Sequence, residues 1–336
     1  MKTTCVFLVA AIAALLSGAG SEAYAQDRSA PRSGDVSIRT DGVGEPIVVV
    51  GDRKLDEDRV REALRDMAKR GRSAREPLGR YHDPLCVTLA GFGDVLGARI
   101  AERIAAQARI VGANVAEPGC TPNATVVMVD KPVVLLDRMR RERPGLLDSD
   151  SLRRIRATLR SGYPAISWAS TERRDQFGRQ LAPGNPLSGY EQDSLFNEMM
   201  FARDNRFPSQ LNVDFSIARS GAVVVFDAYK MDGVHLDQLA DYAVMRILGD
   251  PRPGTDPAAE GPRTILDLFH AGPDAAPPGL TLVDLAYLRG IYTMSPTEPA
   301  SRLESFALTA YAELAGDSKD AEDDCAEEPD DACIPG

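Results

Sequence analysis

Histidines near carboxylates are the residues of this chain that could hold a catalytic metal ion. The sequence contains three histidines, His82, His235 and His270, and the second is followed closely by Asp237 and Asp241. Imidazole nitrogens and carboxylate oxygens are ordinary zinc ligands. Positions two apart, such as 235 and 237, do not share a helix face. We therefore predict that each histidine is structural, because zinc would need three of these five side chains within about 4 Å of one point.

A glycine-rich turn suggests a second chemistry, the binding of a dinucleotide phosphate. Gly91, Gly93 and Gly97 stand between a predicted strand and a predicted helix, and Glu117 follows 20 residues after Gly97. Such glycines let backbone amides approach a pyrophosphate. The spacing G-x-G-x-x-x-G is looser than the dinucleotide-binding form, and Asp94 would repel an anion at the helix start. We interpret the segment as a tight turn before a helix and predict no cofactor.

Cysteines are the third group with chemical potential. Cys5 lies in the predicted leader. The rest of the chain has an even number of cysteines, Cys86, Cys120, Cys325 and Cys333. In an oxidising compartment such cysteines pair, and the absence of C-x-x-C spacing argues against a zinc knuckle or a thioredoxin-type site. Among the three possible pairings we favour Cys86 with Cys120 and Cys325 with Cys333. Paired cysteines are no nucleophiles, and the sequence contains neither a G-x-S-x-G elbow nor a P-loop.

The first 25 residues have the form of a secretory signal. Lys2 precedes an apolar run, 6–16, which is too short to span a bilayer, and Ala23-Tyr24-Ala25 matches a cleavage site. We expect cleavage after Ala25 and a mature protein in the periplasm or outside the cell. The alternative is an uncleaved anchor helix. No later stretch of the sequence has the character of a membrane span.

Composition and charge narrow the function classes. The 336 residues are 43% hydrophobic and 26% charged, and the formal net charge is -11. A dedicated nucleic-acid binder needs clustered positive charge, so this class is excluded. Nine acidic residues and a single basic one, Lys319, give the segment 317–331 a net charge of -8. Such a block is typical of a solvated tail and could bind divalent cations weakly.

The elements that would position these residues follow from hydrophobic periodicity. We predict a signal peptide (1–25), a disordered arm (26–44), an extension (45–83) with a strand at 45–51 and a charged helix, an α+β domain (84–315) and a disordered acidic tail (316–336). Strands are expected at 85–90, 124–129 and 165–170, and as a hairpin of 211–218 with 222–228. The long loop 173–210 could line a ligand groove or cover the core with a helical turn, through Tyr190, Glu191, Asp193, Phe196 and Asn197.

Helices are expected between and after these strands. The charged helix 55–72 has an apolar stripe of Val60, Leu64 and Met67, and helix 91–111 has one of Leu96, Ile100, Ile104 and Ala108. One or two basic helices are expected in 135–160, and others at 234–248, which Gly249 would end, and at 264–269. Capping sequences start a helix at Thr281, ending near Tyr292, and a last one at Ser295-Pro296, ending near Leu314.

The segment 280–292 carries the pattern L-T-x-x-D-x-x-x-L-x-x-I-Y, which resembles the last helix of metzincin-type zinc peptidases. In that family the preceding helix carries H-E-x-x-H, two imidazoles one turn apart and a glutamate base. Here His235 is followed by Leu236 and has Leu239 at the fourth position. The resemblance therefore implies a zincin-like scaffold whose zinc site is absent, similar to uncharacterised secreted bacterial families with this degenerate ending.

Together these observations predict an α+β protein, a single domain with a mixed twisted sheet, packed helices and a zincin-like order of elements. The function expected is that of a secreted, non-catalytic binding or envelope-associated protein. Its partner would be a protein or another envelope component, and neither nucleic acid nor a membrane span is expected. The alternative is a secreted hydrolase, either a metal-dependent peptidase with unusual ligands or an enzyme with a carboxylate pair.

Overall fold

The structure is a computed structural model of the chain and describes residues 57–68, 76–142, 147, 149–181, 213, 215–251 and 261–327. Several sequence predictions lie outside these residues. They are the leader 1–25, the arm 26–44, the strand at 45–51, the end of the acidic tail, and the loop residues Tyr190, Glu191, Asp193, Phe196 and Asn197.

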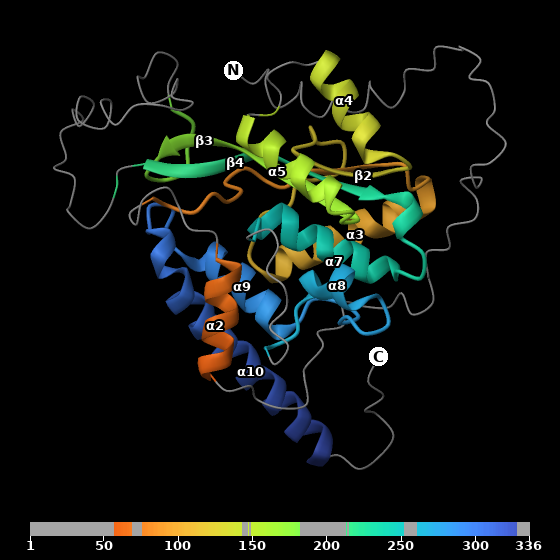
Figure 1. Cartoon of the computed structure of the whole chain (residues 1–336). Helices are drawn as coiled ribbons and strands as arrows, with labels where there is room; N and C mark the ends of the chain where they lie inside the picture. The colour runs from red at the N-terminus through yellow and green to blue at the C-terminus, as the bar shows by residue number, and fades with distance from the viewer. Residues whose placement is uncertain are drawn as a thin grey trace.

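A four-stranded mixed sheet organises the described part of the chain. Its order is β1 (Val87–Ala90), β2 (Ala124–Val129), β4 (Phe215–Asp227) and β3 (Ala165–Asp175). The first three strands are parallel, and β3 pairs with β4 in the antiparallel sense. Helices pack on this sheet in a single body, so the predicted α+β class with a mixed sheet is confirmed (Figure 1).

Strand β4 lies between β2 and β3 and is buried on both faces. Ala222, Val224 and Phe226 belong to the larger apolar cluster of the molecule, whereas Val223 and Val225 belong to a smaller one. Alternate residues of a strand point to opposite faces of a sheet, so the two clusters lie on its two sides. The nearly unbroken apolar run of this strand is what a doubly covered strand requires.

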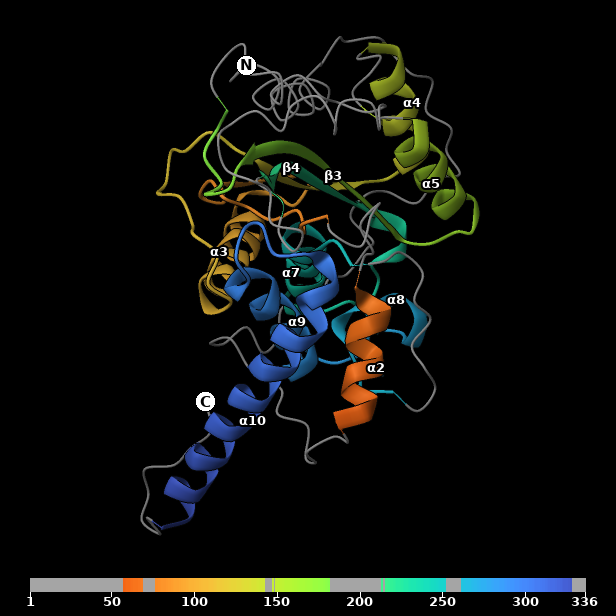
Figure 2. The same cartoon turned by 90° about the vertical axis from the view of Figure 1, so that its left-hand side faces the viewer.

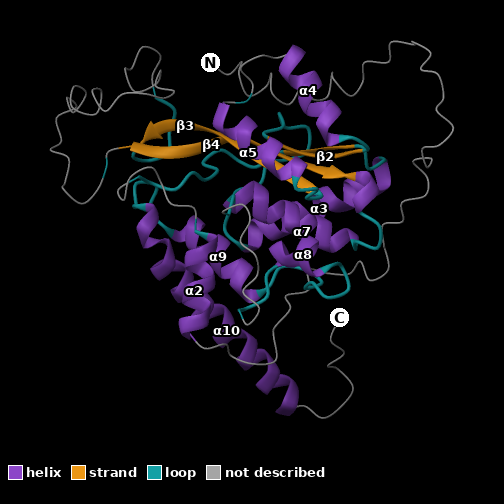
Figure 3. Ribbon diagram, in the orientation of Figure 1, coloured by secondary structure: helices purple, strands orange, loops and turns teal. Residues whose placement is uncertain are grey.

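The larger cluster is covered by helices on one side of the sheet (Figures 1 and 3). These are α3 (Asp94–Ile110), α7 (Leu236–Val244), α8 (Leu268–Ala271) and α9 (Leu282–Thr293). In α3 the predicted stripe is confirmed at Ile100, Ile104 and Ala108, which are fully buried, and Leu96 packs against the same cluster. A π-helical turn, Met245–Gly249, continues α7 and ends it at the predicted glycine.

The other side of the sheet carries α4 (Pro132–Glu142) and α5 (Ser149–Arg160), so the predicted basic segment forms two helices (Figure 2). Leu136 and Met139 of α4 and Ile155 of α5 pack with Trp168 of β3 in the smaller cluster. The molecule therefore has two apolar layers that the sheet separates.

Two further helices pack against α9. Helix α2 (Glu57–Met67) buries Val60, Leu64 and Met67 in the larger cluster, which confirms the predicted stripe. Helix α10 (Leu303–Glu327) begins on α9 and projects away from the body (Figure 2). No helix among the described residues is both long and apolar enough to cross a membrane.

The predicted hairpin around Arg219-Ser220-Gly221 is wrong, because β4 runs through these residues as one strand. The partner strand β3 is longer than predicted and extends into the expected loop as far as Asp175. Register pairs Ser170 with Gly221 and Thr171 with Arg219, so Ser220 is accommodated as a β-bulge. A bulge keeps both halves of the strand paired where the sequence suggests a turn.

The prediction for the last helix is wrong at both ends. Residues 295–298 form a turn, and a 3-10 turn, Ala300–Arg302, precedes α10. The backbone amide of Ala300 bonds to the carbonyl of Glu76, and Pro299 restricts the residue before it, so the helix starts later. At the other end α10 reaches Glu327, within the segment predicted to be disordered. Between Leu303 and Glu327 the sequence contains no proline, and the first one after it is Pro329.

Candidate functional site

Residues of α4 and α5 line a groove of about 730 Å³. These two helices lie on the side of the sheet opposite α7 and α9 (Figure 1). Val133 and Leu136 of α4 and Leu152 and Leu159 of α5 line it with aliphatic surface. Val133 is 52% exposed, and Leu136 is buried and also belongs to the smaller apolar cluster. The groove floor is therefore continuous with the apolar layer above the sheet.

The rim of the groove is cationic. Arg153, Arg156 and Arg160 line it from α5, and Asp137 lines it from α4. Arg153 pairs with Asp150 at 2.9 Å, an exposed contact that contributes little. Among the described residues neither Arg156 nor Arg160 is paired with a carboxylate within 4 Å, and the Arg160 Nε donates to the backbone carbonyl of Arg156 at 3.2 Å. The charges of these two groove residues are therefore not neutralised by a described carboxylate.

The sequence of the two helices explains both properties. Helices α4 and α5 together contain seven basic and three acidic residues, a net charge of +4 in a chain whose net charge is -11. Helix α5 buries only Ser151 and Ile155, because a single narrow stripe faces the sheet. A second hollow of about 370 Å³ lies beside α4, where Val134, Arg138 and Tyr229 are among its lining residues.

A buried pair of polar side chains, Tyr242 and Arg246, lies at the end of α7 and in the π-helical turn that continues it. Tyr242 and Arg246 are one turn apart, and the Arg246 Nε donates to the Tyr242 hydroxyl at 3.1 Å. The hydroxyls of Tyr163 and Tyr242 are 3.5 Å apart, and the ring of Phe269 packs edge-on against Tyr242. Burial raises the pKa of Tyr163. This cluster ties α7 to the loop before β3 and to α8.

The five residues first considered as zinc ligands fall into separate environments. Arg103 of α3 donates to both carboxylate oxygens of Asp241, at 2.9 and 2.7 Å, and lies 3.1 Å from Asp237. The ring of His270 lies 5.2 Å from that of Tyr163, and the backbone amide of His235 donates to Gln238 at the start of α7. The described residues contain no group of three or more His, Cys, Asp or Glu placed to hold a metal ion.

His82 lies in a further environment, near the charges of Arg80, Arg174 and Asp83. Arg174 pairs with Asp83 and Glu172, and Arg80 donates to the carbonyl of Ile291. Burial lowers the pKa of His82 to about 4, and the charges of Arg80 and Arg174 act in the same direction. The His82 side chain is therefore neutral at neutral pH.

The glycine turn is tight, as predicted. Gly91 has φ +85°, and a β-carbon there would come 2.1 Å from the carbonyl oxygen of Met128. Gly93 has φ +69° and precedes the first residue of α3, Asp94. Neither hollow described above is lined by residues of this turn. The turn joins β1 to α3, and the positive φ of Gly91 and Gly93 accounts for glycine at these two positions.

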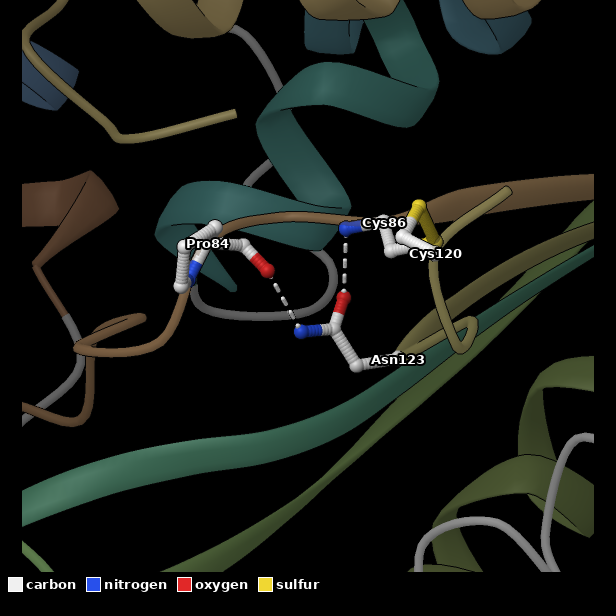
Figure 4. Close-up of a disulfide and its surroundings, with 4 residues drawn as sticks. All are labelled: Pro84, Cys86, Cys120 and Asn123. Atoms are coloured by element: carbon white, nitrogen blue, oxygen red, sulfur yellow. Dashed lines mark hydrogen bonds between the residues drawn. A yellow bond between two sulfur atoms is a disulfide. The ribbon is translucent and has the colours of Figure 1, made fainter. Parts of the chain in front are cut away.

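The predicted disulfide between Cys86 and Cys120 is confirmed, with α-carbons 6.1 Å apart (Figure 4). Asn123 supports it, because its side chain accepts from the amide of Cys86 at 2.8 Å and donates to the carbonyl of Pro84 at 3.0 Å. The bond closes the β1–α3 unit at the start of β2. Cys333 lies outside the described residues, so the second pairing, Cys325 with Cys333, stays a prediction.

Sequence reasoning missed the groove and the Tyr242–Arg246 cluster. The groove has a visible signal, since 135–160 is basic with a helical pattern, but nothing in the sequence shows that both helices share one side of the sheet. The partner of Tyr242, Tyr163, is 79 residues away in the sequence. Comparison of the chain with family models, curated proteins and solved structures finds no match.

Proposed function

We propose that the protein is a secreted, non-catalytic binding module on a degenerate zincin-like scaffold, and that its α4–α5 groove binds an acidic polypeptide segment. The observation that carries the proposal is the groove itself, an aliphatic floor beneath a rim with two arginines that no described carboxylate neutralises. An extended or helical segment can bury small apolar side chains on such a floor while its carboxylates meet the arginines.

The non-catalytic part of the proposal is supported by the residues of α7. This helix precedes α9, which begins at the Thr281 cap of the metzincin-like pattern. Where the H-E-x-x-H pattern would place two imidazoles one turn apart, this chain has His235, the residue before α7, and Leu239. Later in α7 and in the π-helical turn after it, Tyr242 and Arg246 are bonded to one another and buried. A phenol and a guanidinium in this arrangement form a packed structural group with no exposed nucleophile.

The binding part can be tested with a synthetic helical peptide that has leucine on one face and glutamate on the other. Trp168 is the only tryptophan of the chain and belongs to the same apolar cluster as Leu136 in the groove floor. We expect the peptide to change its fluorescence in a saturable manner, and we expect added salt to weaken binding.

The charge requirement is tested by reversing Arg156 and Arg160 together. The double variant Arg156→Glu and Arg160→Glu should bind the peptide about tenfold more weakly, because two attractive pairs become repulsive. Arg109→Glu on α3 is the matched control, since this arginine is exposed on the other side of the sheet. Equal loss in the control, or no loss in the groove variant, would overturn the proposed groove function.

Elemental analysis of the exported protein, purified without chelator or histidine tag, tests the non-catalytic part separately. We expect less than stoichiometric metal. Near-stoichiometric zinc would overturn this part and favour the alternative, a metal-dependent peptidase with unusual ligands.

A further inference from the structure

The groove and the acidic end of α10 have opposite charge and lie on opposite sides of the molecule. The two helices of the groove, α4 and α5, have a net charge of +4, and the acidic segment 317–331 has a net charge of -8. The remaining residues of that segment are mainly small, with Ser318, Ala321 and Ala326 among them. Small residues allow a backbone to approach an aliphatic floor closely, so the segment has the chemistry that the groove requires.

The orientation of α10 decides which groove the segment can reach. Helix α10 packs on α9, on the far side of the sheet from α4 and α5, and points away from them (Figures 1 and 2). Its 25 residues correspond to about 38 Å of helix, so the helical end lies well beyond the body. The end of α10 and the groove of the same molecule therefore lie on opposite sides of the sheet. The end of α10 points away from its own molecule, where a second molecule can contact it.

We propose that the acidic segment 317–331 of one copy binds the α4–α5 groove of a second copy. This inference rests on the proposed function and names the groove's partner. The contact joins two different surfaces, so each copy keeps one free groove and one free acidic segment. Such head-to-tail contacts extend into open chains, or close into rings where the rotation permits.

Sedimentation of the full-length mature protein at low and high salt tests the inference. We expect concentration-dependent assemblies larger than a dimer at low salt and monomers at high salt, because exposed charges are screened. The groove variant Arg156→Glu and Arg160→Glu should stay monomeric at low salt. So should a tail variant with Asp320→Lys, Asp323→Lys and Asp324→Lys, whose three reversals change the segment's net charge from -8 to -2. The control Arg109→Glu should assemble as the wild type does.

Mixing the two variants gives the sharper result. The groove variant keeps its acidic segment and the tail variant keeps its basic groove, so the mixture should form one-to-one pairs that cannot grow further. Failure to pair, or assembly of the groove variant alone, would overturn the inference. A wild type that stays monomeric but binds the acidic peptide overturns the inference and keeps the groove function, whereas loss of both results overturns both.

Discussion

At the scale of single residues, the buried charges of this protein mostly hold elements together. The guanidinium of Arg103 reaches Asp241 across 138 positions of sequence, and the Asp241 carboxylate also accepts the amide of Leu280 at 2.9 Å. Arg219 donates to the carbonyls of Ile247 and Gly79. Removing one partner of a buried pair costs about 3–5 kcal/mol, because the other charge is left without compensation. These residues are structural ties between α3, α7 and the sheet.

Asp284 gives a prediction on pH dependence. Its carboxylate is fully buried and accepts the amides of Ile265 and Thr281, at 2.8 and 3.0 Å, and burial raises its pKa from 3.8 to about 7. The folded state therefore binds this proton more tightly than the unfolded state, and the associated stability is lost as pH rises from about 4 to 7. The variant Asp284→Asn should lack this loss.

Urea unfolding of both proteins between pH 4 and 8 checks the Asp284 prediction. The difference in unfolding free energy, wild type minus variant, should fall with pH and become constant above the folded-state pKa. The asparagine oxygen can still accept both amides, so the cap of α9 is retained in the variant. Parallel curves across the whole pH range would contradict the prediction.

At this scale, prediction from sequence succeeds where a short segment carries the information, or where an even number of cysteines indicates disulfides. The cap of α9 is visible as Thr281 followed three residues later by Asp284, and the confirmed disulfide is one of the bonds that four cysteines allow. The partners of Arg103 and Tyr242 are not predictable. These partners depend on which helix faces pack against one another on one side of the sheet, and no local sequence pattern predicts that packing.

At the scale of elements, the turn between β1 and α3 provides a matched pair of variants. Gly91 and Gly93 both have positive φ, but only a β-carbon at Gly91 would meet a backbone atom, the carbonyl oxygen of Met128. A positive φ costs a side chain about 1–3 kcal/mol at either position. We expect Gly91→Ala to be destabilised more than Gly93→Ala, since the clash adds to the same backbone strain.

Thermal unfolding of the two glycine variants measures this difference directly. Gly91→Ala should unfold at a lower temperature than Gly93→Ala, and both should unfold below the wild type. Similar unfolding temperatures for the two variants would show that the turn relaxes away from β2.

The elements themselves are largely predictable because their hydrophobic periods are clear, as in α3 and α7. The errors arise where tertiary contacts override a local turn or cap. Arg219-Ser220-Gly221 has the composition of a turn, but pairing along the whole of β3 keeps it extended. Ser295-Pro296 has the form of a helix start, but the backbone bond from Ala300 to Glu76 delays the helix.

At the scale of the whole molecule, we propose that residues 1–25 direct export and are removed. Intact mass of the exported protein should match a chain that begins at Gln26, with the hydrogens of four thiols lost to two disulfides. Blocking the cleavage site with Ala25→Asp should leave the leader attached. A wild-type protein that retains its leader in the membrane would instead support the anchor-helix alternative.

The double burial of β4 has an evolutionary consequence. Val223 and Val225 contact one layer and Ala222, Val224 and Phe226 the other, so this strand constrains both layers at once. Substitutions on the exposed faces of α4 and α5 leave this strand in place, whereas a change at Val223 or Val225 also moves the backbone against which the other layer packs. In a diverging lineage we expect the exposed residues of α4 and α5 to change faster than the buried residues of β4 and α7.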